Sequence, residues 1–160
     1  MSRRDEIKEL ALAVNDALTV YIAVHDAIFR EAATLKSLLK NILGRGVPMS
    51  KLLEESEQLQ PLWDALHKRI VDFRQSTYSS LSEGERGYFD ILSRYVEAVR
   101  ETVTALVDRP RLLNHGTMDG PRDPMTWEAL QQKERIYKES VRQYIEIGQE
   151  LNAASPIIFR

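Results

Sequence analysis

The feature that most constrains this chain is a row of apolar residues at spacings of three and four or their multiples. In the first part of the sequence this row consists of Ile7, Leu10, Val14, Leu18, Tyr21, Ile28, Leu35 and Ile42. Residues three and four apart share one face of an α-helix, whereas a strand requires alternation. Similar rows recur to the end of the chain and no segment alternates convincingly, so the sequence predicts an all-α protein.

Breaks in these rows divide the chain into four expected helices, at about 4–43, 51–80, 83–109 and 124–154. Gly44-Arg45-Gly46 ends the first helix, because glycine favours a helix C-terminus. Pro61 either kinks or breaks the second helix, or opens a new one in its first turn. Ser82-Glu83-Gly84-Glu85 has the form of a capping box and starts the third.

The third helix is expected to end or bend at Asp108-Arg109-Pro110, followed by a loop from about 112 to 122. An apolar tail, 156–160, follows the fourth helix and is expected to fold back onto the core. The connections are mostly short, which is typical of antiparallel neighbours. We therefore predict one domain over 1–160, an antiparallel up-down-up-down four-helix bundle.

Composition excludes several classes of protein. The chain has no cysteine, which removes disulfides, thiolate nucleophiles and thiolate metal sites. A net charge of −2 provides no overall attraction for nucleic acid. No apolar stretch is long enough to span a bilayer, and the N-terminal residues lack the apolar core of a secretory signal. These features predict a cytoplasmic protein that does not bind membranes.

Two polar residues interrupt apolar rows. His25 falls on the same helical face as Val14, Leu18 and Tyr21, so we expect it to face the core with a polar or aqueous partner. Glu134 occupies one slot in the row Trp127, Leu130, Tyr137, Val141, Tyr144, Gly148 and Leu151. An unpaired carboxylate there is costly, so Glu134 is expected to be paired, hydrogen-bonded or protonated.

His67 and Asp64 are further candidates for a ligand site. Asp64-Ala65-Leu66-His67 has the carboxylate-to-histidine spacing of metal-binding bundles, but it occurs only once. A metal site therefore has weak support, and no cofactor is predicted. A bundle that binds a small molecule or a metal through His25, Glu134, His67 and Asp64 remains the alternative function.

The segment Arg109-Pro-Arg-Leu-Leu-Asn-His115 resembles the arginine-to-histidine motif of HEPN ribonucleases, which are dimeric helical bundles. The resemblance implies that Arg109 and His115 contact and cleave RNA. Pro110 departs from that motif, which usually has a polar residue there. Independently, Arg109, Arg111 and Arg122 with His115 form a small cationic loop that could meet an anion. A HEPN-like ribonuclease is therefore a second alternative.

The first helix has a second apolar stripe, formed by Ala13, Ala17, Val20, Val24 and Ala27. Together the two stripes are wider than the ordinary apolar face of a surface helix. Either a second neighbour within the chain or another copy covers this surplus. We expect a homodimer through this stripe. With no motif for catalysis, the leading hypothesis is a non-catalytic protein with an interaction or structural role.

Overall fold

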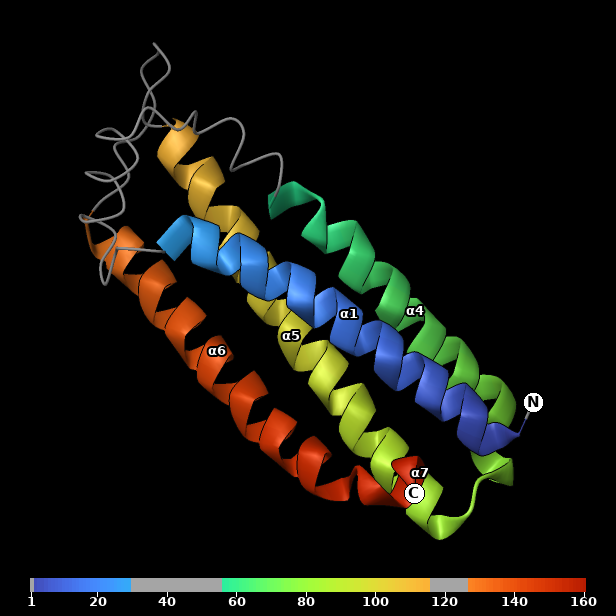
Figure 1. Ribbon diagram of the computed structural model, residues 1–160. Helices are drawn as coiled ribbons and strands as arrows, with labels where there is room; N and C mark the ends of the chain where they lie inside the picture. Colours follow the sequence, from blue (N-terminus) through green and yellow to red (C-terminus); the bar gives the residue numbers. More distant parts are fainter. Residues whose placement is uncertain (1, 30–55, 116–126) are drawn as a thin grey trace.

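The structure is a computed structural model, in which residues 2–29, 56–115 and 127–160 are described. The described residues are almost all helical and include no strand (Figure 1). The long helices are α1 (Arg3–Phe29), α4 (Leu59–Thr77), α5 (Glu83–His115) and α6 (Trp127–Ala154). Two short helices complete this part of the chain, the 3₁₀-helix η1 (Tyr78–Ser80) and α7 (Pro156–Phe159). The prediction of an all-α four-helix bundle is confirmed.

Each long helix runs opposite to the one before it in Figure 1. Side-chain contacts between α4 and α5 agree with this antiparallel direction. At one end of the α4–α5 pair, Arg74 Nη2 lies 2.7 Å from Asp90 Oδ1. At the other end, Thr104 Oγ1 donates to Gln60 Oε1 at 2.9 Å. The sequence separation between partners thus grows with distance from the turn, as in an antiparallel helical hairpin.

Pro61 lies at the N-terminal end of α4. The helix begins at Leu59, so Pro61 lies in its first turn, where the missing N–H has no intrahelical acceptor to lose. Residues 30–43 of the expected first helix and 51–55 of the expected second lie outside the described residues, as does the expected fourth-helix start near 124.

The predicted end of the third helix is wrong. Helix α5 continues through Pro110 to His115, so residues 112–115 belong to the helix and not to the expected loop. Proline within a helix costs about 3 kcal/mol, because one hydrogen bond is lost and the ring clashes with the carbonyl group four residues earlier. The turns before it are anchored by fully or almost fully buried side chains, at Val99, Val103, Leu106 and Val107. Packing of this row offsets the local penalty.

The expected apolar rows form one core. Its largest fully buried side chains include Trp63, Tyr21, Phe89, Ile7, Leu59, Leu92 and Leu106. The rings of Phe73 on α4 and Phe89 on α5 lie 4.9 Å apart. The capping box at the start of α5 is formed, since Ser82 N donates to Glu85 Oε2 at 2.8 Å. Within the described ranges, no helix has the length and apolarity needed to cross a membrane.

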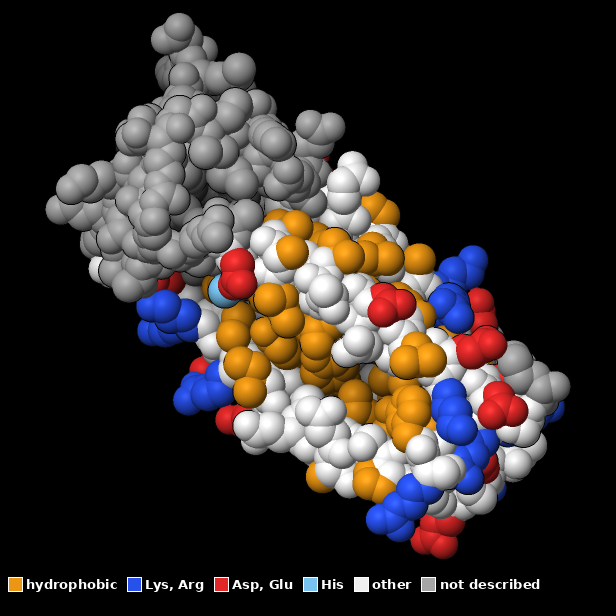
Figure 2. Space-filling model, in the orientation of Figure 1, with side chains coloured by type: hydrophobic (Ala, Val, Ile, Leu, Met, Phe, Trp, Pro, Cys, Tyr) orange, Lys and Arg blue, Asp and Glu red, His pale blue; other side chains and the backbone are white. Residues whose placement is uncertain are grey.

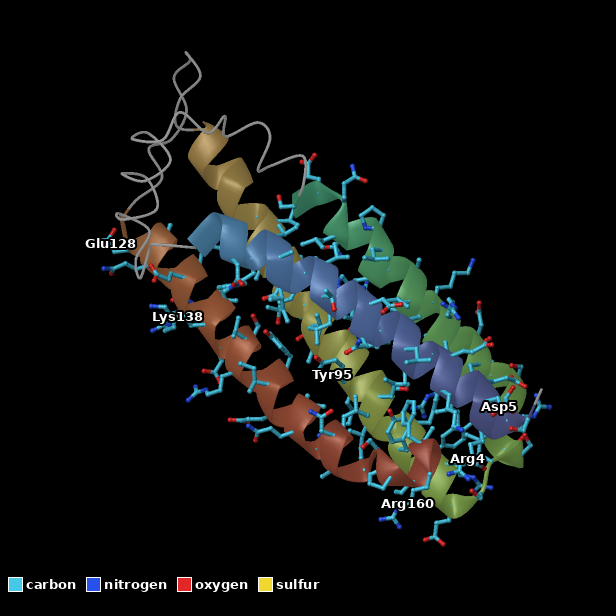
Figure 3. The ribbon with its side chains drawn as sticks, in the orientation of Figure 1. Arg4, Asp5, Tyr95, Glu128, Lys138 and Arg160 are labelled. Atoms are coloured by element: carbon cyan, nitrogen blue, oxygen red, sulfur yellow. The ribbon has the colours of Figure 1, made fainter. Side chains whose placement is uncertain are left out.

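The C-terminal tail folds back onto the start of α1. Ile158 is completely buried, while its neighbours Ile157 and Phe159 are each 47% exposed. Arg4 donates from Nε to the carbonyl oxygen of Ile158 and from Nη2 to that of Arg160, each at 2.8 Å. Figure 3 shows Arg4 and Arg160 close together at this end of the bundle. One arginine thus joins the two ends of the chain.

Ile158→Ala is expected to lower the free energy of unfolding by about 2–5 kcal/mol, because it removes a fully buried side chain. Ile157→Ala, one residue earlier and half exposed, is the matched control and is expected to change it by less than about 1 kcal/mol. Urea unfolding of both variants measures the difference. Equal effects would show that the tail does not anchor the bundle.

Candidate functional site

Helices α1 and α6 are joined near both of their ends. At one end, the hydroxyl oxygens of Tyr21 on α1 and Tyr137 on α6 lie 2.9 Å apart. The Tyr21 ring also meets the Tyr144 ring edge-on, with centroids 5.8 Å apart. At the other end, α7 and its contact with Arg4 connect the helices. Between these two attachments lies a groove.

The groove has a volume of about 400 Å³. Helix α5 forms its floor, α1 and α6 its walls, and α7 one end. Its lining residues are Ala11, Leu12, Val14, Asn15, Leu18, Tyr88, Tyr95, Gly148, Leu151, Asn152, Ser155 and Phe159. None of them carries a charge. Figure 2 shows the corresponding surface as a hollowed, mostly hydrophobic band with charged side chains toward its borders.

Gly148 makes room for the floor of the groove. A Cβ atom on Gly148 would lie 3.0 Å from Cε2 of Tyr95, which is tighter than an ordinary carbon–carbon contact. In Figure 3, Tyr95 lies on α5 beneath the space between α1 and α6. The Tyr88 ring, two turns earlier on α5, contacts the Phe159 ring with centroids 6.5 Å apart. Two tyrosines therefore form the floor, and a glycine allows α6 to approach one of them.

The polar groups of the groove are neutral. Burial, with a smaller contribution from Tyr144, raises the pKa of Tyr95 to about 12. Burial also raises the pKa of Tyr88, so both phenols remain protonated near neutral pH. The other polar lining residues, Asn15, Asn152 and Ser155, carry amides or a hydroxyl. Such a groove suits an uncharged apolar group, because a buried charge would find no opposite charge in the lining.

Large apolar side chains also stand exposed around this groove. Leu12 is 55% exposed on α1 and Phe159 is 47% exposed on α7, and both line the groove. Ile22 is 44% exposed four residues after Leu18, and Ile145 is 46% exposed three residues before Gly148. Helical spacing places these two isoleucines on the same faces as those lining residues. We call the groove and these four residues the α1–α6 face.

His25 lies at the Tyr21–Tyr137 end of this face. Its side chain is 33% exposed, and its Nδ1 lies 3.2 Å from Oδ1 of the adjacent Asp26. Its ring centroid is 6.0 Å from that of Tyr21 and 6.1 Å from that of Tyr137, with the latter pair stacked. The histidine is thus half-buried among tyrosines beside a carboxylate.

Glu134 has the kind of partner that its position requires. Its carboxylate lies 2.8 Å from Nζ of Lys138, and its side chain is 20% exposed. The partner comes from the next turn of α6. An ion pair within one helix is a structural interaction and does not by itself make a ligand site.

His67 and Asp64 lie on the opposite pair of helices. His67 Nε2 is 2.9 Å from Glu97 Oε2, and Arg100 Nε is 2.6 Å from Asp64 Oδ1. The hydrogen bond from Arg100 is the main reason that the pKa of Asp64 lies below its usual value. His25 and Glu134 each pair within their own helix. Asp64 and His67 instead belong to one cluster of ion pairs between α4 and α5, because Arg100 also lies 3.4 Å from Glu97. Among the residues that the structure describes, no group of three or more histidines and carboxylates is arranged to hold a metal ion.

The candidates for an anion or RNA site lie around the end of α5. Arg109, Arg111 and His115 have helical backbone in α5, but their side chains lie outside the described part, as does all of Arg122. The predictions of an anion-binding or RNA-contacting loop therefore lie outside the described side chains.

The expected dimer stripe is largely used within the chain. Ala17 is buried, and Ala13 and Val24 are partly buried against the core. Val20 is 48% exposed, and the side chain of Ala27 is not described. The exposed apolar side chains that α1 contributes beside the groove, Leu12 and Ile22, lie on the other flank of this helix.

No protein-family model, no curated protein and no solved structure matches this chain. The function is therefore inferred from the geometry of the chain itself.

Gly148→Ala is expected to destabilise the protein by about 1–2 kcal/mol, because the new methyl group displaces Tyr95. Gly87→Ala is the matched control in α5, where an added Cβ meets no atom within 4 Å. That substitution is expected to stabilise the helix by about 0.5–1 kcal/mol. Urea unfolding reports both values, and stabilisation by both alanines would mean that Tyr95 moves away freely.

Stability is expected to fall as the pH rises from the ordinary tyrosine pKa near 10 toward about 12. In this window the unfolded chain releases the Tyr95 proton while the folded protein retains it, so unfolding becomes more favourable. Tyr95→Phe is expected to flatten the decrease. Urea unfolding at several alkaline pH values tests this, and an equally steep decrease in the variant would contradict it.

Proposed function

We propose that this protein is a non-catalytic interaction protein whose α1–α6 face binds the apolar side of a helix of a partner protein. The supporting observation is the combination of a neutral hollow with half-exposed leucine, isoleucine and phenylalanine side chains beside it. Contiguous apolar surface of this kind is uncommon on proteins that act alone.

A helix fits the whole face better than a small molecule does. A compound of suitable size would fill the hollow of about 400 Å³. It would leave Ile22 and Ile145, which do not line the hollow, in water. A helix lying along α1 and α6 would cover these side chains and insert one of its own side chains between Tyr88 and Tyr95. Recognition of an amphipathic helix in a groove uses this kind of contact.

The chemistry of the groove favours binding over catalysis. Its lining includes no carboxylate, imidazole or ammonium group. The raised pKa values of Tyr88 and Tyr95 make their phenols weak acids near neutral pH. The metal-binding and HEPN-like alternatives receive no support from the described residues.

The homodimer expected through the stripe Ala13, Ala17, Val20, Val24 and Ala27 stays a prediction. Cytoplasmic localisation stays a prediction, which fluorescence microscopy of a tagged protein in its source cell tests.

The proposal is tested by calorimetric titration with two probes. One is an uncharged synthetic helical peptide with leucines along one face, and the other is the neutral dye Nile red. The wild-type protein is expected to bind the peptide. Asn152→Trp, which places an indole at the groove, is expected to weaken peptide binding at least tenfold. Gln143→Trp is the matched control, because Gln143 is also exposed on α6 but lies on its opposite side.

The outcomes separate the alternatives. Peptide binding that is lost in Asn152→Trp and retained in Gln143→Trp supports the proposal. Nile red binding with the same pattern, without peptide binding, would replace it by the small-molecule alternative. If neither probe binds, or both variants bind like the wild type, the groove is not the functional surface.

A further inference from the structure

The outer surface of α1 carries a third row of residues, distinct from the row that faces the core and from the small-residue stripe. This row is Lys8, Leu12, Asn15, Thr19, Ile22 and Asp26, and we call it the α1 seam. Its spacings are four, three, four, three and four, so all its members share one helical face. Lys8 is half-buried and the others are exposed. Leu12 and Asn15 also line the groove, so the seam borders it.

The α1 seam is complementary to a second copy of itself that runs in the opposite direction. In an antiparallel pair of α1 helices centred at Ala17, Leu12 faces Ile22 of the second copy. Asn15 then faces Thr19 of the second copy, and Lys8 faces its Asp26. Apolar side chains meet at two positions, amides meet hydroxyls at two, and opposite charges meet at both ends.

We infer that a second copy of this chain docks on the α1–α6 face through an antiparallel, two-fold pairing of the α1 seams. This deepens the proposed function and rests on it, since it requires that the chain acts through helix packing on this face. It names the partner that the proposed function leaves open.

In a two-fold dimer the same surface patch of each copy meets its counterpart, so the patch must be complementary to itself. The middle of the seam, from Leu12 to Ile22, carries no charge and therefore creates no repulsion between the copies. The charged residues stand at opposite ends, where the antiparallel arrangement pairs a cation with an anion. A parallel arrangement would place Lys8 beside Lys8 and Asp26 beside Asp26, which is unfavourable.

The polar pair at the centre has a suitable geometry. The Thr19 hydroxyl donates to the carbonyl oxygen of Asn15 in its own helix, at 3.1 Å. Its oxygen can still accept a hydrogen bond from the Asn15 amide of the second copy. Ile145, half-exposed on the neighbouring α6, adds apolar surface on the groove side of the same face. The pairing therefore covers apolar side chains without burying an unpaired charge.

Sedimentation equilibrium of the full chain at micromolar concentrations tests the dimer. The wild type is expected to dimerise, and Ile22→Lys to weaken dimerisation at least tenfold. Glu9→Lys is the matched control, because Glu9 is exposed on α1 but lies about 100° around the helix from Lys8. Circular dichroism confirms that each variant keeps its helices.

A charge exchange tests the register. Lys8→Glu and Asp26→Lys are each expected to weaken the dimer severalfold, and the double variant is expected to recover affinity. His25 contacts Asp26 and loses this contact equally in the single Asp26→Lys variant and in the double variant. The loss therefore cannot explain a recovery of affinity in the double variant. Weakening in the double variant as large as the sum of the single effects would overturn the antiparallel pairing.

Cysteine cross-linking provides an independent test, because the chain has no cysteine of its own. Leu12→Cys protein mixed with Ile22→Cys protein is expected to form a disulfide-linked dimer on oxidation. Either variant alone is expected to form far less. Efficient linking of Leu12→Cys to itself would instead indicate a parallel pair and would overturn the inference.

The inference and the proposed function fail differently. A wild type that stays monomeric but binds the leucine-faced peptide in a manner sensitive to Asn152→Trp would overturn the α1 seam and leave the proposed function standing. A protein that neither dimerises nor binds the peptide would overturn both. A dimer that Ile22→Lys does not affect would place the contact elsewhere and would also overturn the seam.

Discussion

The geometry of this bundle depends on how α6 is held against α1. Tyr21 and Tyr137 join the helices at one end through their hydroxyls, and Arg4 holds the carbonyl group of Ile158 at the other. Between these points α6 rests on α5, where Gly148 allows it to approach Tyr95. Because α1 and α6 are fastened at their ends and supported from below, a groove remains between them. The candidate function follows from this attachment.

Most of the fold was readable from the spacing of apolar residues. The row containing Ile7, Leu10, Val14 and Tyr21 became the buried face of α1, and Ser82 with Glu85 formed the expected capping box. The end of α5 could not be predicted from the sequence, because Pro110 was the local signal for it. A local rule describes the cost of the proline within a helix but not the burial of Val103 and Leu106 just before it.

The candidate site was largely hidden from sequence reasoning, because a groove depends on the separation of two helices that are distant in the chain. Its one local signal was Gly148, a residue without a side chain in a row of large ones. A polar residue in an apolar row is a poorer signal of a site, since Glu134 pairs with Lys138 one turn away. Ala17 of the expected dimer stripe is buried within the chain itself, while Val20 of the same stripe is 48% exposed. Periodicity shows which residues are apolar on a face but not what covers them.

The core row of α1 is more apolar than the α1 seam. The core row therefore serves folding, and the seam serves association. The core row is continuously apolar and buried, so the helix is held in the bundle without a partner. The α1 seam has only two large apolar residues among its six, separated by an amide and a hydroxyl. A contact built in this way is weaker than the core and gains its selectivity from register and end charges. A folded monomer is therefore expected to persist when the seam is disrupted, which makes association adjustable without loss of the fold.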